Sequence, residues 1–310
     1  MAFWNHWPTH SSERFHSALL DRPPISSPTG TPYELATDPK EVQAFLRTYF
    51  GSRRTPVLDL VVEPEDEVFV LKDEEGMVGC VRYHPMGLLR STHSVEQPIY
   101  LVDAFCVHPR WRGKGIAAYL LSCLHRHSNQ RGRPHALFLK EGPPLPILQA
   151  PLYSGQYVYR FLTKRLHSCI QDLTVEEAER RIQIFLQFQP DLFVIWNPKA
   201  KQQWKAYGRG PYHVLACVQD THQRIGKKRM GWVTAWFESP MMPEEVRADA
   251  ALTLSDTMSF DAVWMDRAWI TEGKSESEGK SVWTPDGWFH WYAYQWTTSL
   301  SFGRSYCLVG

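Results

Sequence analysis

One segment, residues 102–118, constrains the fold more than any other part of the chain. A strongly apolar stretch at 99–107 predicts a strand, and it runs into a basic loop that contains Gly113 and Gly115. An amphipathic helix is expected at 116–126, with four residues on its inward face: Ile116, Leu120, Cys123 and Leu124. A strand, a glycine loop and a helix in this order predict an α/β fold with an anion site at the start of the helix.

The loop has the sequence Arg112-Gly-Lys-Gly115-Ile-Ala117, which fits the pattern (Q/R)xxGx(G/A). Backbone N–H groups of such a loop converge on one point, and the helix dipole adds positive potential there. Together with the charges of Arg112 and Lys114, this suits a pyrophosphate. The segment resembles the coenzyme A loop of the GNAT acyltransferase superfamily. In that fold the preceding strand splays from its neighbour, the acyl chain or pantetheine lies in the gap, and strand N–H groups stabilise charge on the thioester oxygen.

The rest of the chain shows helix and strand patterns in two halves with the same helix–strand–strand order. The first half is expected to have a helix at 38–49 and strands at 57–62, 68–72, 77–83 and 135–139. In the second half a capping box at Thr174 and Glu177 starts a helix that ends near 188, and Pro243 starts another that ends near 257. Strands are expected there at 192–196, 212–218, 231–237, 260–264 and 288–296. A duplicated fold with a divide near residue 167 follows.

Composition excludes several classes of protein. In 310 residues, 34 Lys and Arg stand against 33 Asp and Glu, so the basic surface of a general nucleic-acid binder is missing. No run of about 18 apolar residues predicts a membrane span, and no signal-peptide pattern is found. The six cysteines form no CxxC pair, and His125 and His127 point apart on the expected helix, so reduced thiols and no metal are expected. We expect a cytoplasmic monomer.

Residues 1–32 are rich in Pro, Ser and Thr and also contain Phe3, Trp4 and Trp7. Large aromatic rings are costly in a free tail, so we expect this arm to dock on the rest of the molecule.

Several motifs resemble one GNAT branch, the N-myristoyltransferases, and they occur in the family's order along most of the chain. The family's NFLCVH motif corresponds here to Asp103-Ala-Phe-Cys-Val-His108. Further corresponding stretches are Phe3-Trp4-Asn-His-Trp-Pro8, Pro32-Tyr-Glu-Leu35, Gly142-Pro-Pro-Leu-Pro146, Tyr157-Val-Tyr-Arg160, Asp286-Gly287, Tyr292-Ala-Tyr-Gln-Trp296 and the apolar end Tyr306-Cys-Leu-Val-Gly310.

The resemblance implies two tandem GNAT-like halves with a mixed, saddle-like central sheet. Residues 1–32 would wrap the coenzyme, 33–166 would bind acyl-CoA, and 167–310 would bind a protein with an N-terminal glycine. Myristoyl would pass from myristoyl-CoA to the glycine amine by direct attack. The implied coenzyme contacts are Phe3, Trp4, Phe105, Cys106, Val107, Arg112, Gly113, Lys114, Gly115, Ile116 and Ala117.

The same resemblance implies the catalytic groups. The backbone amides of Ala104 and Phe105 would form the oxyanion hole, and the free carboxylate of Gly310 would be the general base. An α-amine has a pKa near 8, so a buried carboxylate within hydrogen-bond reach can take its proton.

The substrate contacts include positions where this chain departs from the family. Lys140-Glu-Gly142 replaces the family's Thr-Ala-Gly beside the substrate amine, and Tyr159 replaces a peptide-binding histidine. The implied substrate-binding residues are Lys140, Gly142, Tyr157, Tyr159, Asp286 and Gly287.

Two other functions stay open. The glycine-rich loop favours a GNAT acetyltransferase with a short acyl chain, and Lys140 and Tyr159 favour a catalytically degenerate protein that binds acyl-CoA or an acylated protein. Cys106 and His108 are interpreted as structural, because each lies at the end of an apolar strand without a recognisable catalytic partner. No Ser–His–Asp set has a nucleophile-elbow motif.

Overall fold

The computed structural model describes residues 25–50, 57–58, 62–90, 96–133, 135–145, 151–270, 282–294 and 305–309. The elements up to residue 161 are β1 (Glu34–Leu35), α3 (Pro39–Tyr49), β2 (Val57–Leu58), β3 (Glu67–Asp73), β4 (Gly76–Arg90), β5 (Gln97–Val107), the 3₁₀ helix η1 (Pro109–Trp111), α4 (Ile116–Gln130), β6 (Ala136–Glu141) and β7 (Tyr153–Phe161). The later elements are β8 (Ile170–Leu173), α5 (Val175–Phe188), β9 (Val194–Trp196), β10 (Gln202–Arg209), β11 (Tyr212–Ile225), β12 (Lys228–Glu238), α6 (Glu244–Asp256), β13 (Ala262–Asp266), the 3₁₀ helix η2 (Arg267–Trp269), β14 (Thr284–Tyr294) and β15 (Tyr306–Leu308).

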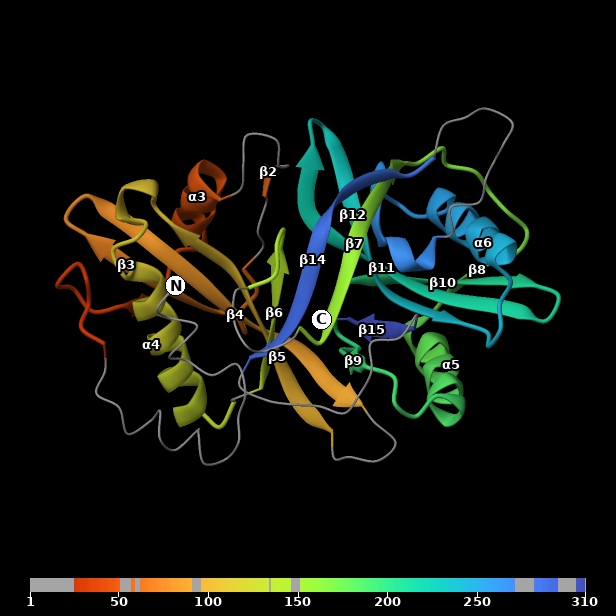
Figure 1. The fold of residues 1–310 in the computed structure, drawn as a ribbon, viewed down its shortest axis with the longest axis horizontal. Helices are drawn as coiled ribbons and strands as arrows, with labels where there is room; N and C mark the ends of the chain where they lie inside the picture. Colours follow the sequence, from red (N-terminus) through yellow and green to blue (C-terminus); the bar gives the residue numbers. More distant parts are fainter. Residues whose placement is uncertain are drawn as a thin grey trace.

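In the described part of the chain, 15 strands form one mixed sheet (Figure 1). Its main path has the order β1-β3-β4-β5-β6-β14-β7-β13-β12-β11-β10-β8. Most neighbours are antiparallel, but β5 with β6, β12 with β13 and β9 with β15 are parallel. The expected α/β fold with one large mixed sheet is therefore confirmed.

Two connections hold the halves of this sheet together. Strand β14 comes late in the sequence but lies between β6 and β7, where His290 pairs with Lys140 on one side and Ser154 on the other. Strand β9 pairs with both β4 and β15, and β15 in turn pairs with β12. The chain therefore crosses repeatedly between the two parts, and the predicted spans 33–166 and 167–310 stay predictions as domains.

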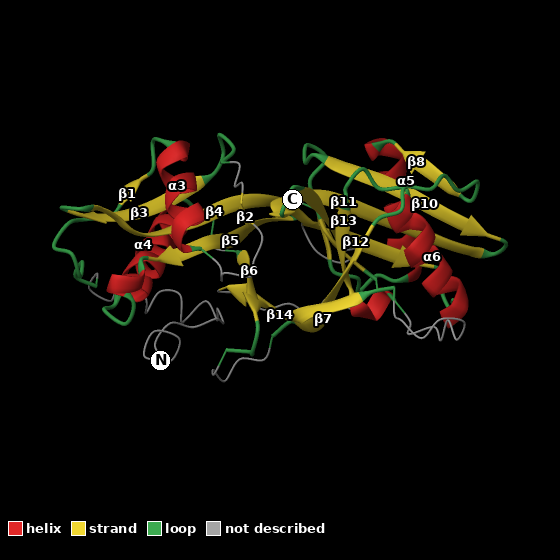
Figure 2. Cartoon of the chain, turned by 90° about the horizontal axis from the view of Figure 1, so that it is seen from above, coloured by secondary structure: helices red, strands yellow, loops and turns green. Residues whose placement is uncertain are grey.

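The two helices of the first part cover opposite faces of the sheet (Figure 2). Because side chains alternate along β3, Val68 and Val70 face α3 while Phe69 and Leu71 face α4. The contacting residues are Val42, Phe45 and Leu46 of α3 and Ile116, Leu120 and Leu124 of α4. Strand β3 is thus buried on both sides.

The second part repeats this plan. Along β11, Leu215 and Cys217 pack toward α5, while Val214, Ala216 and Val218 pack toward α6. The helix residues in contact are Ala178, Ile182 and Leu186 of α5 and Val246, Ala250 and Leu254 of α6. Each part is a helix–sheet–helix sandwich, as a duplicated fold requires. No helix in the described ranges has the length and hydropathy needed to cross a membrane.

The expected helices are confirmed with small changes at their ends. The capping box of Thr174 and Glu177 is present, and Asp38 caps α3. The predicted strand at 77–83 is too short, because β4 continues to Arg90. Pro85 and Gly87 both lie in the additional part of β4, and the pairing with β5 shifts between them, so the sheet accommodates both residues at a bulge. Strands β1, β7, β8 and β10 were not predicted.

Candidate active site

Strands β5 and β6 separate after a short stretch of pairing. Their parallel register joins only Tyr100, Leu101 and Val102 to Ala136, Leu137 and Phe138. Strand β5 continues to Val107, so in the described part of the chain no strand lies beside its residues 103–107 on the β6 side. Among the described residues, this leaves the backbone edge without a neighbouring strand directly before the glycine loop, which is the splay that the resemblance to GNAT proteins implied.

On its other edge β5 pairs with β4, and a bulge interrupts this pairing directly after Asp103. Arg82 pairs with Asp103 and Cys80 pairs with Cys106, so Ala104 and Phe105 have no register partner on β4. Ala104 has a φ of 47°, in the left-handed region that non-glycine residues rarely adopt. Such backbone outliers cluster at functional sites. The two residues predicted to form the oxyanion hole are therefore the two that leave the ladder.

The glycine loop brings β5 to the first turn of α4. Gly113 and Gly115 have φ of 78° and 85°, and Gly115 is the N-cap of the helix without a side-chain cap. No described residue accepts a hydrogen bond from the amide of Gly115 or Ile116. These N–H groups, with Lys114 and Arg112 beside them, form a donor site that fits a pyrophosphate. The predicted coenzyme residues from Phe105 to Ala117 therefore lie on one strand–loop–helix corner.

The N-terminal arm approaches this corner where it is described. Pro28 lies next to Gly115: its Cγ would be 3.7 Å from a Cβ placed on that glycine. The amide of Tyr33 donates to the hydroxyl of Tyr119 in α4 at 3.1 Å. Phe3 and Trp4, the predicted aromatic contacts of the coenzyme, lie outside the described residues.

Cys106, near the end of β5, and His108, directly after it, both have surroundings that suit a structural role. Cys106 is 3 % exposed, and burial raises the pKa of its thiol to about 11, so the thiolate needed for nucleophilic attack is scarce. The His108 Nδ1 accepts a hydrogen bond from the Arg110 amide at 3.2 Å, and its ring packs edge-on against Tyr49. Both surroundings agree with the structural interpretation.

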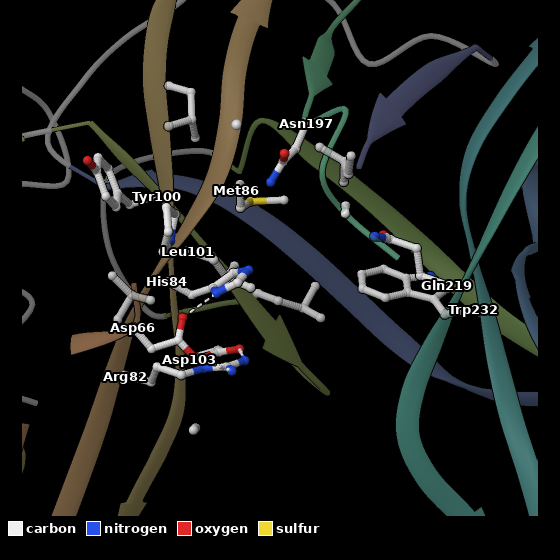
Figure 3. Close-up of a pocket in the computed structure, with 18 of the residues that line it drawn as sticks. Asp66, Arg82, His84, Met86, Tyr100, Leu101, Asp103, Asn197, Gln219 and Trp232 are labelled. Atoms are coloured by element: carbon white, nitrogen blue, oxygen red, sulfur yellow. Dashed lines mark hydrogen bonds and ion pairs between the residues drawn. The ribbon is translucent and has the colours of Figure 1, made fainter. Parts of the chain in front are cut away.

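A cavity of about 1720 Å³ lies between the two parts of the sheet. Ala104 and Phe105 line it from the bulge, and the strands of the second part supply the opposite wall. Figure 3 shows Gln219 and Trp232 projecting from that side, facing Met86 and His84 of β4. The open edge of β5 therefore borders a space that both parts enclose.

A charged network that the sequence did not predict forms one wall of this cavity. Arg82 donates to Asp103 through Nε (2.7 Å) and Nη2 (2.5 Å), and to Asp66 through Nη1 (3.1 Å). Burial alone lowers the pKa of Arg82, but the charges of Asp103 and Asp66 outweigh it and raise that pKa. The Asp66 carboxylate also binds Nδ1 of His84 at 2.5 Å (Figure 3). The only sequence signal was the alternation of Arg82 and His84 along an apolar strand.

The predicted substrate residues are brought near one another on β6, β7 and β14, and only some line the cavity. Lys140, Tyr157 and Asp286 line it, as does Glu141. The pairing of β14 with β7 shifts between Pro285 and Trp288, so Asp286 and Gly287 form a bulge at the level of Tyr157.

Three of these predicted residues do not line the cavity. Gly142 donates its amide to the Trp288 carbonyl (2.8 Å) and accepts from His290 (3.0 Å). Gly287 lies within the bulge, and Tyr159 packs edge-on against Phe161. Burial raises the pKa of Glu141, and the charge of Asp286 adds to that effect. Glu141 and Asp286 therefore line the cavity as acidic side chains next to Lys140.

The last described residues reach the same region. Leu308 lines the cavity, and Val309 is fully buried with its amide donating to the Ile195 carbonyl at 3.2 Å. The predicted buried terminal strand is confirmed as β15, while Gly310 itself lies outside the described residues. Among the residues that the structure describes, no group of three or more His, Cys, Asp and Glu side chains is arranged to hold a metal.

Comparison with known proteins agrees with this geometry. Residues 64–153 match the family model described as Acetyltransferase (GNAT) domain. That span includes the splayed strands, the bulge, the loop and α4. No curated protein matches the chain.

Three solved structures of Saccharomyces cerevisiae N-myristoyltransferase are similar along most of the chain. One with bound myristoyl-CoA has a TM-score of 0.58 at 11 % identity and covers 94 % of this chain and 87 % of its own. A structure with bound myristoyl-CoA and inhibitors has a TM-score of 0.57 at 12 % identity, covering 91 % and 84 %. A third, with bound myristoyl-CoA, has a TM-score of 0.54 at 12 % identity, covering 90 % and 86 %. At this identity the likeness is one of fold.

Proposed function

We propose that the protein is an acyl-CoA-dependent N-acyltransferase that transfers a long acyl chain, myristoyl, to the N-terminal glycine amine of a protein. One observation carries the proposal: β5 separates from β6 at the point where a bulge frees Ala104 and Phe105, directly before a glycine loop and an uncapped helix. In this order along one strand, the free amides can donate to a thioester carbonyl, the gap can hold a pantetheine arm, and the helix N-terminus can bind a pyrophosphate.

The chain's own groups then have the following roles. The loop amides, Arg112 and Lys114 bind the pyrophosphate, and the amides of Ala104 and Phe105 donate to the thioester oxygen. The coenzyme supplies the activated acyl group. The amine nitrogen forms a bond to the carbonyl carbon, the carbon–sulfur bond breaks, and the thiol keeps one of the two protons that leave the ammonium. The second proton is released.

The size of the cavity supports a long acyl chain together with a peptide. Its volume, about 1720 Å³, exceeds the roughly 300–1000 Å³ of ordinary small-molecule pockets. Apolar residues such as Met86, Ile99 and Leu139 line part of it. The amide side chains of Asn197 and Gln219 line another part, and they can pair with the backbone of an extended peptide.

The carboxylate of Gly310 is part of the proposal as the general base that takes a proton from the glycine ammonium. Support comes from the two residues before Gly310, since Leu308 lines the cavity and Val309 is buried. A short C-terminal extension should abolish turnover and leave coenzyme A binding unchanged. Full turnover by the extended chain would remove Gly310 from the reaction.

The second candidate is acetyl transfer, which the match to a GNAT acetyltransferase model favours. A turnover assay separates the candidates: a glycine-starting peptide is mixed with acetyl-CoA or myristoyl-CoA, and both thiol release and peptide mass are followed. The matched control is the same peptide with a blocked N-terminus. Faster turnover with myristoyl-CoA supports the proposal, and equal or faster turnover with acetyl-CoA contradicts the long chain. Tight binding of acyl-CoA without turnover would indicate a degenerate protein.

A further inference from the structure

We propose that Cys80 is a positioning residue for the oxyanion hole. Its thiol holds the peptide between Ala104 and Phe105 in the orientation that directs the Phe105 amide at the thioester oxygen. The inference rests on the proposed N-acyltransferase function and adds to it a residue that acts through the backbone and does not touch the substrate. Cys80 lies on β4, next to the bulge in β5.

The Cys80 thiol is hydrogen-bonded to the bulge itself. Its Sγ donates to the carbonyl oxygen of Ala104 at 3.4 Å. Cys80 is 0 % exposed, and it lies with Ala104 in the apolar cluster that includes Val42 and Leu46 of α3. Burial raises the pKa of the Cys80 thiol, and the neighbouring Cys106 adds to that effect. The thiol therefore keeps the proton that it donates.

The trans peptide bond couples this carbonyl to the next amide. The C=O of Ala104 and the N–H of Phe105 belong to one planar unit and point in opposite directions. Because β4 lies along one edge of β5, a carbonyl that points to Cys80 directs the Phe105 amide toward the other edge. On that edge no strand of the described chain pairs with residues 103–107. Ala104 and Phe105 both line the cavity, so the amide is turned toward the space proposed for the thioester.

The bulge leaves this peptide without the support of a regular ladder. Ala104 has the unusual φ of 47°, and its ψ and the φ of Phe105 allow the peptide plane to turn, which moves the carbonyl and the amide together. On one side the chain is fixed, because Arg82 holds Asp103. A buried carbonyl without a donor is unfavourable, so the Cys80 thiol favours the orientation in which this carbonyl is satisfied.

The orientation of the amide matters most in the transition state. Negative charge develops on the thioester oxygen only as the amine attacks, and donors that already point at that oxygen stabilise it. An interaction that strengthens only in the transition state raises kcat and has little effect on substrate binding. Loss of the Cys80 thiol should therefore lower kcat and leave the affinity for acyl-CoA unchanged.

The test compares Cys80→Ala, which removes the donor, with Cys80→Ser, which replaces it by a hydroxyl. With myristoyl-CoA and a glycine-starting peptide, Cys80→Ala should lose about tenfold in kcat, less than the roughly 100- to 1000-fold lost when an oxyanion-hole donor is removed outright. The KM for myristoyl-CoA should not change, and Cys80→Ser should recover kcat to within a few fold of wild type.

Cys217→Ala is the matched control. Cys217 of β11 is also 0 % exposed, and its thiol donates to Oε1 of Gln202 at 3.6 Å, so the variant loses a buried thiol and its hydrogen bond away from the bulge. It should keep the wild-type kcat. Melting temperatures check that each variant folds.

Infrared spectroscopy gives a measurement that does not depend on turnover. The probe is myristoyl-CoA with ¹³C at the thioester carbonyl. Hydrogen bonds to this oxygen weaken the C=O bond, so the band of the wild-type complex should lie below that of free myristoyl-CoA. In Cys80→Ala the band should move toward the free value, and in Cys80→Ser and Cys217→Ala it should stay near the wild-type position.

A carbonyl band that does not move in Cys80→Ala would overturn the positioning role, because a residue that only stabilises the fold leaves the band unchanged. A loss of kcat that Cys80→Ser or Cys217→Ala shares in full would overturn it as well. A wild-type protein that acylates no amine would instead contradict the proposed function, and the carbonyl band would still test the role of Cys80.

Discussion

Arg82 donates two parallel hydrogen bonds to Asp103, at 2.7 and 2.5 Å. Asp103 directly precedes the bulge at which Ala104 and Phe105 have no pairing partner on β4. A bidentate guanidinium–carboxylate pair fixes both partners in orientation as well as distance. The pair therefore anchors the strand at the residue where the backbone leaves the ladder.

Arg82→Met should destabilise the fold by about 3–5 kcal/mol, because it leaves the carboxylates of Asp66 and Asp103 without their buried partner. Chemical denaturation measures this. Lys72→Met is the matched control, since Lys72 pairs with Glu34 and Glu41 at the surface and should cost about 0–1 kcal/mol. Equal losses in the two variants would show that the Arg82 network does not stabilise the sheet.

Gly87→Ala should be among the most damaging small substitutions in the chain. Gly87 has a φ of 146°, and a Cβ there would lie 2.4 Å from the carbonyl oxygen of Trp196 in β9. The methyl group would push β4 from β9, so we expect a loss of about 3 kcal/mol or more, on the scale of severe core mutations. Gly76→Ala has a similar φ of 125° and open space, so it isolates the backbone cost of about 1 kcal/mol. The difference in unfolding free energy between the two variants measures the clash.

Lys114→Ala should weaken coenzyme A binding about tenfold, as expected for the loss of one charge-assisted phosphate contact. The side chain is exposed, with its ammonium 4.9 Å from the centre of the Trp111 ring, so folding should be unaffected. Lys227→Ala, in the exposed turn between β11 and β12, controls for net charge. Calorimetry at two salt concentrations should show a gap between Lys114→Ala and wild type that shrinks at high salt. Identical binding by the two variants would remove Lys114 from the site.

Asp266→Asn should become more stable relative to wild type as the pH rises. Burial raises the pKa of Asp266, although hydrogen bonds from Tyr153 (2.6 Å), the Ala268 amide (3.0 Å) and Tyr306 (3.2 Å) oppose the shift. The folded state then holds this proton more tightly than the unfolded state, where the pKa is about 3.9. Wild-type stability therefore falls as the pH rises from that value through the folded pKa, while the variant lacks this loss. Urea denaturation at a series of pH values gives the difference, and a constant gap would contradict the raised pKa.

Local signals explain what the sequence predicted well. The loop at Gly113 and Gly115, the cap at Asp38 and the capping box at Thr174 depend on residues within a few positions of one another. Each is set by backbone geometry that only a few residue types allow, so the type reveals the element.

The charged wall of the cavity could not be predicted in the same way. Asp66 and His84 are 18 positions apart, and they meet only because β3 and β4 pair antiparallel in one register. The contact of Arg82 with Asp103 depends in turn on the pairing of β4 with β5, which bulges shift, and no local pattern marks where a bulge will fall. Ala104 illustrates the limit, since alanine gives no sign of a left-handed φ.

The position of β14 between β6 and β7 also sets an order of assembly. Gly142 and His290 are hydrogen-bonded at 3.0 Å although 148 positions separate them in the sequence. Closing so long a loop costs entropy before any contact offsets it, so the centre of the sheet should form late and slowly. Until residues 284–294 arrive, β6 and β7 lack the strand that joins them, and such open edges pair readily with other chains. The nascent chain should therefore be most prone to aggregation in the interval before its last long strand is in place.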